Sequence, residues 1–179
     1  YYYGTWIGCR VKNCGIYGIY GGSGGVVDGC AINGVQKGYA SLANSIITNS
    51  VFYDCSDTAI VLGNTTGTGA NLVRQCTIDG ISGGGRVGIS SQLGISKIFN
   101  CIFCRLGTAL KGISEAGEHR EAHYSCFHDN TADYENWRSG EGNIHSDPKF
   151  VNAAGHDYHL QFGSPCRGTG GPTRLNDQD

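Results

Sequence analysis

The sequence predicts an all-β fold, a parallel β-solenoid in which similar stretches of chain stack on one another. The first observation behind this prediction is a short phrase that returns six times. In each phrase a small or amide residue precedes Cys or Ser, and an apolar or ring side chain follows two positions later. The six phrases are Gly8–Val11, Gly29–Ile32, Asn49–Phe52, Gln75–Ile78, Asn100–Phe103 and Ser125–His128. Repeats of about 20 to 50 residues are typical of solenoids and propellers.

The second observation is the spacing of the phrase. Its Cys or Ser recurs after 21, 20, 26, 25 and 25 residues, at Cys9, Cys30, Ser50, Cys76, Cys101 and Cys126. Leucine-rich repeats need several Leu in each unit, and the chain has only eight Leu. Propeller blades need about 40 residues each. A β-sandwich stays open as the alternative, because its strands can follow one another at a similar spacing.

The third observation is the composition. The chain has 179 residues, enough for one domain, and 30 of them are Gly. Pro occurs only at positions 148, 165 and 172, so the first 147 residues keep every backbone N–H for strand pairing. The chain lacks Met and opens on three Tyr residues, so we expect a mature product or part of a longer chain. Neither a signal peptide nor an apolar run of about 18 residues is visible, and no membrane span is expected.

Each repeat is expected to be a strand, a one-residue corner, a second strand and a variable Gly-rich turn. Side chains alternate along a strand, so the Cys or Ser and the residue two positions later share the inner face. The apolar residue three positions earlier shares that face only if the chain bends between them. The residue directly before the Cys or Ser supplies the bend, since Gly and Asn tolerate left-handed conformations. His123 and His128 take inward positions in the last repeat, where we expect the core to end.

Nine Cys residues raise the questions of disulfides and metal. The repeating Cys residues are interpreted as small buried hydrophobic groups with free thiols. Cys101 and Cys104 have the local spacing of a zinc-binding pair, but no second pair accompanies them. We therefore predict no metal site.

The ending of the chain carries a family resemblance. Asp147-Pro148-Lys149-Phe150, Asp157-Tyr158-His159-Leu160 and Ser164-Pro165-Cys166 follow in the order seen at the end of many bacterial secreted β-helix proteins, and Ile98–Phe103 is similar to their coil signature. The chain thus resembles the pectate-lyase-like superfamily of right-handed parallel β-helices. The resemblance implies a single-stranded right-handed parallel β-helix of about six coils over residues 1–140, with an irregular C-terminal cap and tail at 141–179. It also implies a secreted or cell-surface location.

Outward residues of neighbouring coils form rows about 4.8 Å apart, and two rows suggest a ligand. The row two positions before the Cys or Ser places Arg74, Phe99 and Tyr124 on consecutive coils. The row three positions after it contains Lys12, Asn33 and Tyr53 on consecutive coils. A cation beside aromatic rings suits a sugar ring and its carboxylate. The alternative is an ordinary solenoid surface, where aromatic residues favour strand packing.

Catalytic groups are less well defined, and whether the protein is an enzyme stays open. A uronate lyase needs a cation and a base, for which Arg74 is the candidate cation. A glycoside hydrolase needs facing carboxylates, and Asp54, Asp57 and Asp79 are the candidate set, although the first two also suit turns. The chain lacks the clustered Asp residues of a calcium site, so no cofactor is expected. The charged run 115–123 is interpreted as a solvated loop.

Charge excludes one class of partner. Residues 1–111 carry eight Lys or Arg and four Asp, a balance of +4, and residues 112–179 have a balance of −6. Neither half is basic enough for nucleic acid.

We expect a domain that recognises polysaccharide or serves as a rigid building block, with a lyase or hydrolase of acidic polysaccharide as the alternative. An open first coil would expose strand edges, so a neighbouring domain or protomer is expected to cover it.

Overall fold

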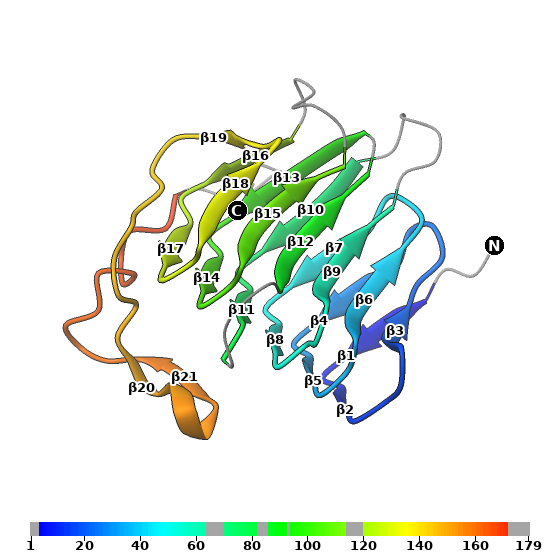
Figure 1. The fold of residues 1–179 in the computed structure, drawn as a ribbon, viewed down its shortest axis with the longest axis horizontal. Coiled ribbons are helices and arrows are strands. Elements are labelled where there is room, and N and C mark those ends of the chain that lie inside the picture. Colours follow the sequence, from blue (N-terminus) through cyan, green and yellow to red (C-terminus); the bar gives the residue numbers. More distant parts are fainter. Residues whose placement is uncertain (1–3, 64–69, 82–85, 93, 114–119, 172–179) are drawn as a thin grey trace, which may run out of the picture.

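The fold is a parallel β-solenoid whose turns each contribute one short strand to each of three sheets (Figure 1). The computed structural model describes residues 4–63, 70–81, 86–92, 94–113 and 120–171. Sheet A contains β1 Thr5–Ile7, β4 Val26–Asp28, β7 Ile46–Thr48, β10 Ala70–Arg74, β13 Ile95–Phe99, β16 Arg120–His123 and β19 Arg138–Ser139. Sheet B contains β2 Arg10–Lys12, β5 Ala31–Asn33, β8 Val51–Tyr53, β11 Thr77–Asp79, β14 Ile102–Cys104 and β17 Cys126–His128. Sheet C contains β3 Tyr17–Tyr20, β6 Lys37–Ser41, β9 Thr58–Leu62, β12 Val87–Ser91, β15 Thr108–Gly112 and β18 Ala132–Glu135.

Equivalent residues of successive coils lie directly above one another, as the repeat predicts. Val27 pairs with Ile47 in sheet A, and Ile32 pairs with Phe52 in sheet B. The six strands of sheet B, and likewise those of sheet C, are separated by five turns of chain. The solenoid therefore has about five turns, slightly fewer than the six coils expected. The all-β prediction and the parallel stacking are confirmed, and the handedness stays a prediction.

The one-residue corner between sheets A and B is confirmed in the first five repeats. Its residues adopt positive φ angles of 61° at Gly8, 61° at Gly29, 49° at Asn49, 54° at Gln75 and 54° at Asn100. This left-handed conformation reverses the side-chain alternation, so apolar residues on both sides of the corner face the interior. Gly8 and Gly29 adopt it without a steric cost from a Cβ.

The predicted register of the sixth repeat is wrong by one residue. The corner is Tyr124, with φ 49°, and Phe127 rather than His128 pairs with Phe103 in sheet B. Ala122 rather than His123 pairs with Ile98 in sheet A. The interior selects this register because Phe127 is 1% exposed and its ring stacks on Phe103 with centroids 5.1 Å apart. An imidazole at that position would bury polar nitrogens in an apolar column.

This shift changes the repeating Cys/Ser position. Ser125 takes the sixth interior place, and Cys126 pairs with Ile102 on the outer side of sheet B. The interior group has a polar role as well as a packing role. The Ser50 hydroxyl donates to Thr48 O at 2.7 Å and accepts the Cys30 N–H at 3.0 Å, and Ser125 does the same between His123 O and Cys101 N. Thiol and hydroxyl groups therefore satisfy backbone groups freed at each corner.

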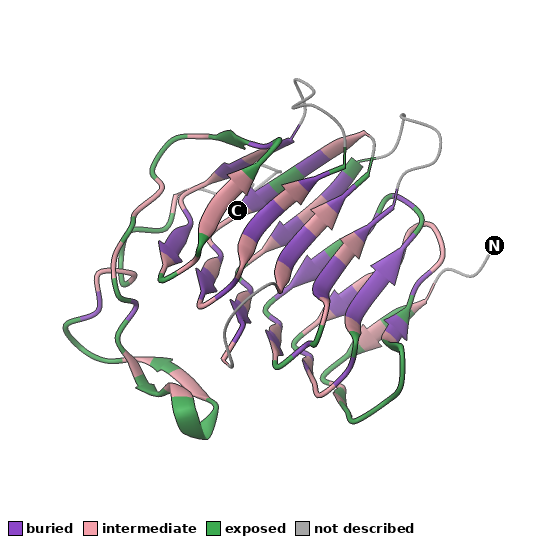
Figure 2. Ribbon diagram, viewed as in Figure 1, coloured by how far each residue is buried: buried purple, intermediate pink, exposed green. Residues whose placement is uncertain are grey.

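The interior is an apolar core that runs the length of the solenoid. Its largest fully buried side chains include Tyr39, Phe52, Phe103 and Phe127, and Figure 2 shows the buried residues along the strands of all three sheets. At the last coil, Tyr134 and His145 pack on the Phe127 ring, with centroids 4.9 and 5.8 Å away. These side chains cover that end of the core.

The residues after the last coil form what we call the C-terminal segment, 147–171. Its hairpin consists of β20 Phe150–Asn152 and β21 Asp157–Leu160, which pair antiparallel, with the short 3-10 helix η1 Ala153–Gly155 between them. The hairpin, drawn in orange in Figure 1, lies on the sheet B side of the solenoid. The C-terminal segment therefore runs alongside the coils.

Candidate functional site

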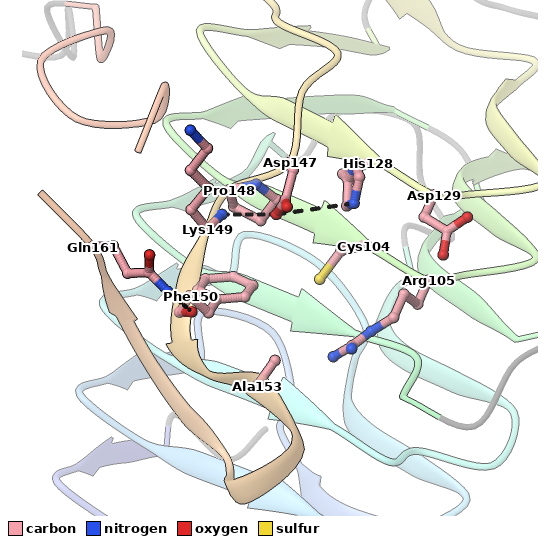
Figure 3. Close-up of a pocket in the computed structure, with 10 residues that line it drawn as sticks. All are labelled: Cys104, Arg105, His128, Asp129, Asp147, Pro148, Lys149, Phe150, Ala153 and Gln161. Atoms are coloured by element: carbon pink, nitrogen blue, oxygen red, sulfur yellow. Dashed lines mark hydrogen bonds and ion pairs between the residues drawn. The ribbon is translucent and has the colours of Figure 1, made fainter. Parts of the chain in front are cut away.

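Two cavities lie where the C-terminal segment packs on sheet B. Cavity 1 has a volume of about 430 Å³ and lies near the last coils (Figure 3). Its lining residues are Cys104, Arg105, His128 and Asp129 from the coils, and Asp147, Pro148, Lys149, Phe150, Ala153 and Gln161 from the C-terminal segment. Cavity 2 has a volume of about 420 Å³ and lies over the first coils. Its lining residues are Arg10, Lys12, Ala31, Asn33, Val51 and Tyr53 from the coils, and Gly155, His156 and Tyr158 from the C-terminal segment.

Asp79 anchors the C-terminal segment between the two cavities. Its side chain is fully buried, and both carboxylate oxygens receive hydrogen bonds from Arg105, the Nε–Oδ1 distance being 2.9 Å. The Tyr158 hydroxyl donates to Asp79 Oδ2 at 2.9 Å. The hydrogen bond to Asp79 raises the pKa of Arg105, while burial and then the Asp79 charge raise the pKa of Tyr158. A carboxylate held in this way connects β11 to the hairpin.

The three predicted hydrolase carboxylates are each held by a different cation. Asp54 pairs with Arg86 at 3.0 Å, and Asp57 pairs with Lys37 at 2.8 Å. Asp79 pairs with Arg105. Retaining glycosidases place two carboxyl groups about 5 Å apart and leave them open to the substrate, whereas Asp79 is closed off from solvent. The geometry gives these three residues structural roles.

The predicted strip on sheet A is only partly assembled. Arg74 and Phe99 are neighbours in the ladder, but the next residue is His123, whose ring stacks on Phe99 at 5.3 Å. The prediction that Tyr124 follows Phe99 in this row is wrong, because Tyr124 is the corner residue. A Cβ added to either Gly142 or Gly171 would lie 2.2 Å from the Tyr124 ring. The Tyr124 ring therefore packs against the backbone at Gly142 and Gly171.

Cavity 2 combines unpaired cations with stacked rings. Arg10 and Lys12 come from β2, and in the described part of the chain no ion pair involves either of them. Tyr53, which the sequence singles out, stacks on His156 with centroids 4.4 Å apart and an interplanar angle of 28°. None of the described residues that line this cavity carries a carboxylate. It therefore presents positive charge beside an aromatic wall.

Cavity 1 has a different electrostatic character. Arg105 and Lys149 line it together with Asp129 and Asp147, so its fixed charges balance. His128 Nε2 lies 4.0 Å from Asp147 Oδ1 (Figure 3). Arg105 is already bonded to Asp79, which leaves less positive charge for a ligand. Cavity 2 is the better candidate for an anionic ligand.

Two further questions from the sequence are metal binding and the charged run 115–123. Among the described residues, no group of three or more His, Cys, Asp or Glu side chains is arranged to hold a metal ion. Residues 115–119, the larger part of the run, lie outside the described residues. Within the described ranges, no helix has the length and apolar character needed to span a membrane.

Sequence reasoning missed most of cavity 2. It named Tyr53 and placed Lys12 in the same outward row, but it did not connect them with His156 and Tyr158. The row itself was a usable signal, because Lys12, Asn33 and Tyr53 are ladder neighbours.

Comparisons with known protein families, curated proteins and solved structures found no match. The fold defines the class of protein, a parallel β-solenoid.

Proposed function

We propose that this chain is a secreted or cell-surface β-helix domain of the pectate-lyase-like type that recognises an acidic polysaccharide in cavity 2. The observation that carries the proposal is the pairing of two free cations, Arg10 and Lys12, with the stacked rings of Tyr53 and His156. The location rests on the resemblance of the chain's ending to secreted β-helix proteins.

The chemistry of cavity 2 suits a sugar acid. A guanidinium group forms paired hydrogen bonds with a carboxylate, and an aromatic face packs against the C–H groups of a sugar ring. Asn33 adds an amide that can exchange hydrogen bonds with hydroxyl groups. The +4 balance of residues 1–111 favours the approach of a polyanion.

Calorimetric titration with an oligogalacturonate and with a neutral galactose oligosaccharide of matched length tests the proposal. We expect binding of the acidic oligosaccharide alone, weakened by salt because charges in solution screen the attraction. Arg10→Gln should weaken it at least about tenfold, which is about 1.4 kcal/mol. Lys97→Gln removes the same charge from the exposed face of β13 and should leave affinity unchanged. Equal binding of both oligosaccharides, or equal effects of both variants, would refute the proposal.

The same oligosaccharides separate recognition from catalysis. A lyase would produce unsaturated ends, and a hydrolase would produce new reducing ends. We expect neither product, because Asp54, Asp57 and Asp79 are each held by a cation. Turnover that is lost in Arg74→Gln or Asp79→Asn would establish the enzymatic alternative instead.

We also propose that a neighbouring domain or a second protomer covers the first coil. Among the residues that the structure describes, strands β1, β2 and β3 each pair on one side only. Large apolar side chains are exposed there, including Ile7 at 69% and Ile16 and Tyr20 at 58%. Sedimentation over a range of concentrations tests the protomer, and a chain that stays monomeric throughout would leave only the neighbouring domain.

A further inference from the structure

Two Cys residues line one small cavity at the junction between the last coil and the C-terminal segment. The register shift of the sixth repeat places Cys126 on the outer side of β17, where Ile102 stands one coil earlier. Cys126 is nevertheless only 3% exposed. Its Sγ lies 3.1 Å from Ser146 O. Both Cys residues line a third cavity of about 140 Å³, together with Leu160 and Ile144.

Cys166 is held in an ordered turn of the C-terminal segment. The Ser164 hydroxyl donates to Pro148 O at 2.6 Å and accepts the Cys166 N–H at 3.1 Å. Five residues further on, Gly171 exchanges two hydrogen bonds with the Asn100 side chain, at 3.0 and 3.1 Å. The segment is therefore fixed on both sides of Cys166, which keeps Cys166 at the cavity that it shares with Cys126.

The two thiols differ in their readiness to react. The hydrogen bond from Cys126 lowers the pKa of Cys166, and Cys166 is partly exposed. The same hydrogen bond, with burial, raises the pKa of Cys126. The interior thiols Cys76 and Cys101 also interact, but each is 1% exposed and shielded from any oxidant in solution. Cys166 is thus the thiol that reacts first, because a thiolate is the attacking species.

We propose that Cys126 and Cys166 are a disulfide-forming pair that fastens the C-terminal segment to the last coil. With oxidised glutathione as the oxidant, the Cys166 thiolate attacks one glutathione sulfur and releases one molecule of reduced glutathione. The Cys126 thiol then gives its proton to solvent and attacks Cys166 Sγ, which releases the second. Two protein thiols are oxidised to one disulfide, and one oxidised glutathione is reduced to two thiols.

The disulfide between Cys126 and Cys166 would limit the movement of residues that line both cavities of sheet B. Lys149 and Phe150 line cavity 1, and His156 and Tyr158 line cavity 2. These residues lie between Cys126 and Cys166 in the chain. Closing the chain at Cys166 restricts how far this stretch can move from sheet B, because the disulfide removes open conformations. Reduction removes that restriction.

Peptide mapping of the full chain tests the pair. The chain is equilibrated with oxidised glutathione, free thiols are alkylated, and trypsin digestion is followed by mass spectrometry without reduction. Peptides 121–138 and 150–167 each contain a single Cys, so a linked pair of these peptides identifies the bond. We expect this linked pair and no other among the described Cys residues. Alkylation of both Cys126 and Cys166 after oxidation, or a bond from Cys166 to a different Cys, would overturn the proposal.

Proteolysis gives a second readout that needs no saccharide and is therefore independent of the proposed function. Oxidation should slow cleavage within 147–165 at least about tenfold in the wild type. Oxidation should not change the cleavage rate of Cys166→Ser or Cys126→Ser. Both variants retain the side-chain size but lack one of the two thiols. Cys14→Ser is the matched control, because Cys14 is exposed and its thiol donates to Lys12 O within its own coil. This variant should behave as the wild type, and equal cleavage of oxidised and reduced wild type would contradict the proposal.

Discussion

The coils and the C-terminal segment are held together in different ways. Side chains inside the coils form continuous apolar columns, and Phe52, Phe103 and Phe127 are each at most 1% exposed. The C-terminal segment buries little of its own surface, and Phe162 is 94% exposed. Figure 2 shows this contrast between the strands of the coils and the hairpin. The segment instead attaches through a few specific contacts, one of which joins Tyr158 to the buried Asp79.

The contrast separates stability from function. Stacked coils gain free energy at every repeat because each buries apolar surface against the next. The C-terminal segment contributes less to folding, but it supplies one wall of each cavity on sheet B. Changes in the coils should therefore affect unfolding, whereas changes at the segment should affect the cavities.

The largest expected effect is loss of an aromatic ring from the column. Phe103→Ala should lower the free energy of unfolding by about 3 to 5 kcal/mol, because it leaves a cavity beside Phe127. Phe162→Ala in the C-terminal segment should change it by less than about 0.5 kcal/mol. Denaturant unfolding of both variants measures the difference. Similar losses of unfolding free energy in the two variants would contradict the proposed difference between the coils and the C-terminal segment.

A smaller effect is expected at the interior Cys position. Cys101→Leu should cost about 1 to 3 kcal/mol, because the site is 1% exposed and already filled. Cys101→Ser should cost less, since the hydroxyl can donate to Phe99 O as the thiol does. A thermal scan that shows no loss for Cys101→Leu would mean that Cys101 points outward. Cys14→Leu, at an exposed position, is the matched control.

The smallest expected effect is at the hairpin anchor. Tyr158→Phe removes the hydroxyl that bonds to Asp79 and should cost about 1 kcal/mol at neutral pH. Tyr20→Phe, on an exposed tyrosine, should be neutral.

The dependence of stability on alkaline pH tests the same contact between Tyr158 and Asp79. Burial and the Asp79 charge raise the pKa of Tyr158 above its ordinary value of 10.0. The unfolded phenol ionises near pH 10 and the folded one at higher pH. The stability from Tyr158 is therefore complete below about pH 10 and is lost as pH rises above it. Unfolding measured from pH 8 to 11 should show a shallower decline in Tyr158→Phe than in the wild type. Parallel declines would contradict this role.

The coils were predictable from the sequence, and the sixth repeat shows the limit of that reasoning. Ser125 and Cys126 are adjacent and both suit the interior position. Only the pairing of Phe127 with Phe103, a contact between coils, selects Ser125. The short phrase contains no information on which neighbouring ring fills the column. The register error then misplaced Tyr124 in the outward row.

The candidate site was predictable only on its solenoid side. Tyr53 and Lys12 belong to an outward row that follows from the repeat. His156 and Tyr158 reach the same cavity through the docking of the C-terminal segment. Asp79 and Tyr158 are 79 positions apart in the chain, and no periodicity relates the two. Their contact depends on one buried carboxylate meeting one hydroxyl, which composition and spacing do not reveal.

The docking of the C-terminal segment on sheet B is tested most directly by nuclear Overhauser effects between aromatic rings in solution. Cross-peaks are expected from Tyr53 to both His156 and Tyr158, whose ring centroids lie 4.4 and 5.9 Å away. Phe103 and Phe127, with centroids 5.1 Å apart inside the coils, provide the internal reference. A spectrum with the Phe103–Phe127 cross-peak but none from Tyr53 to the hairpin would show intact coils without a docked segment, and would contradict both cavities.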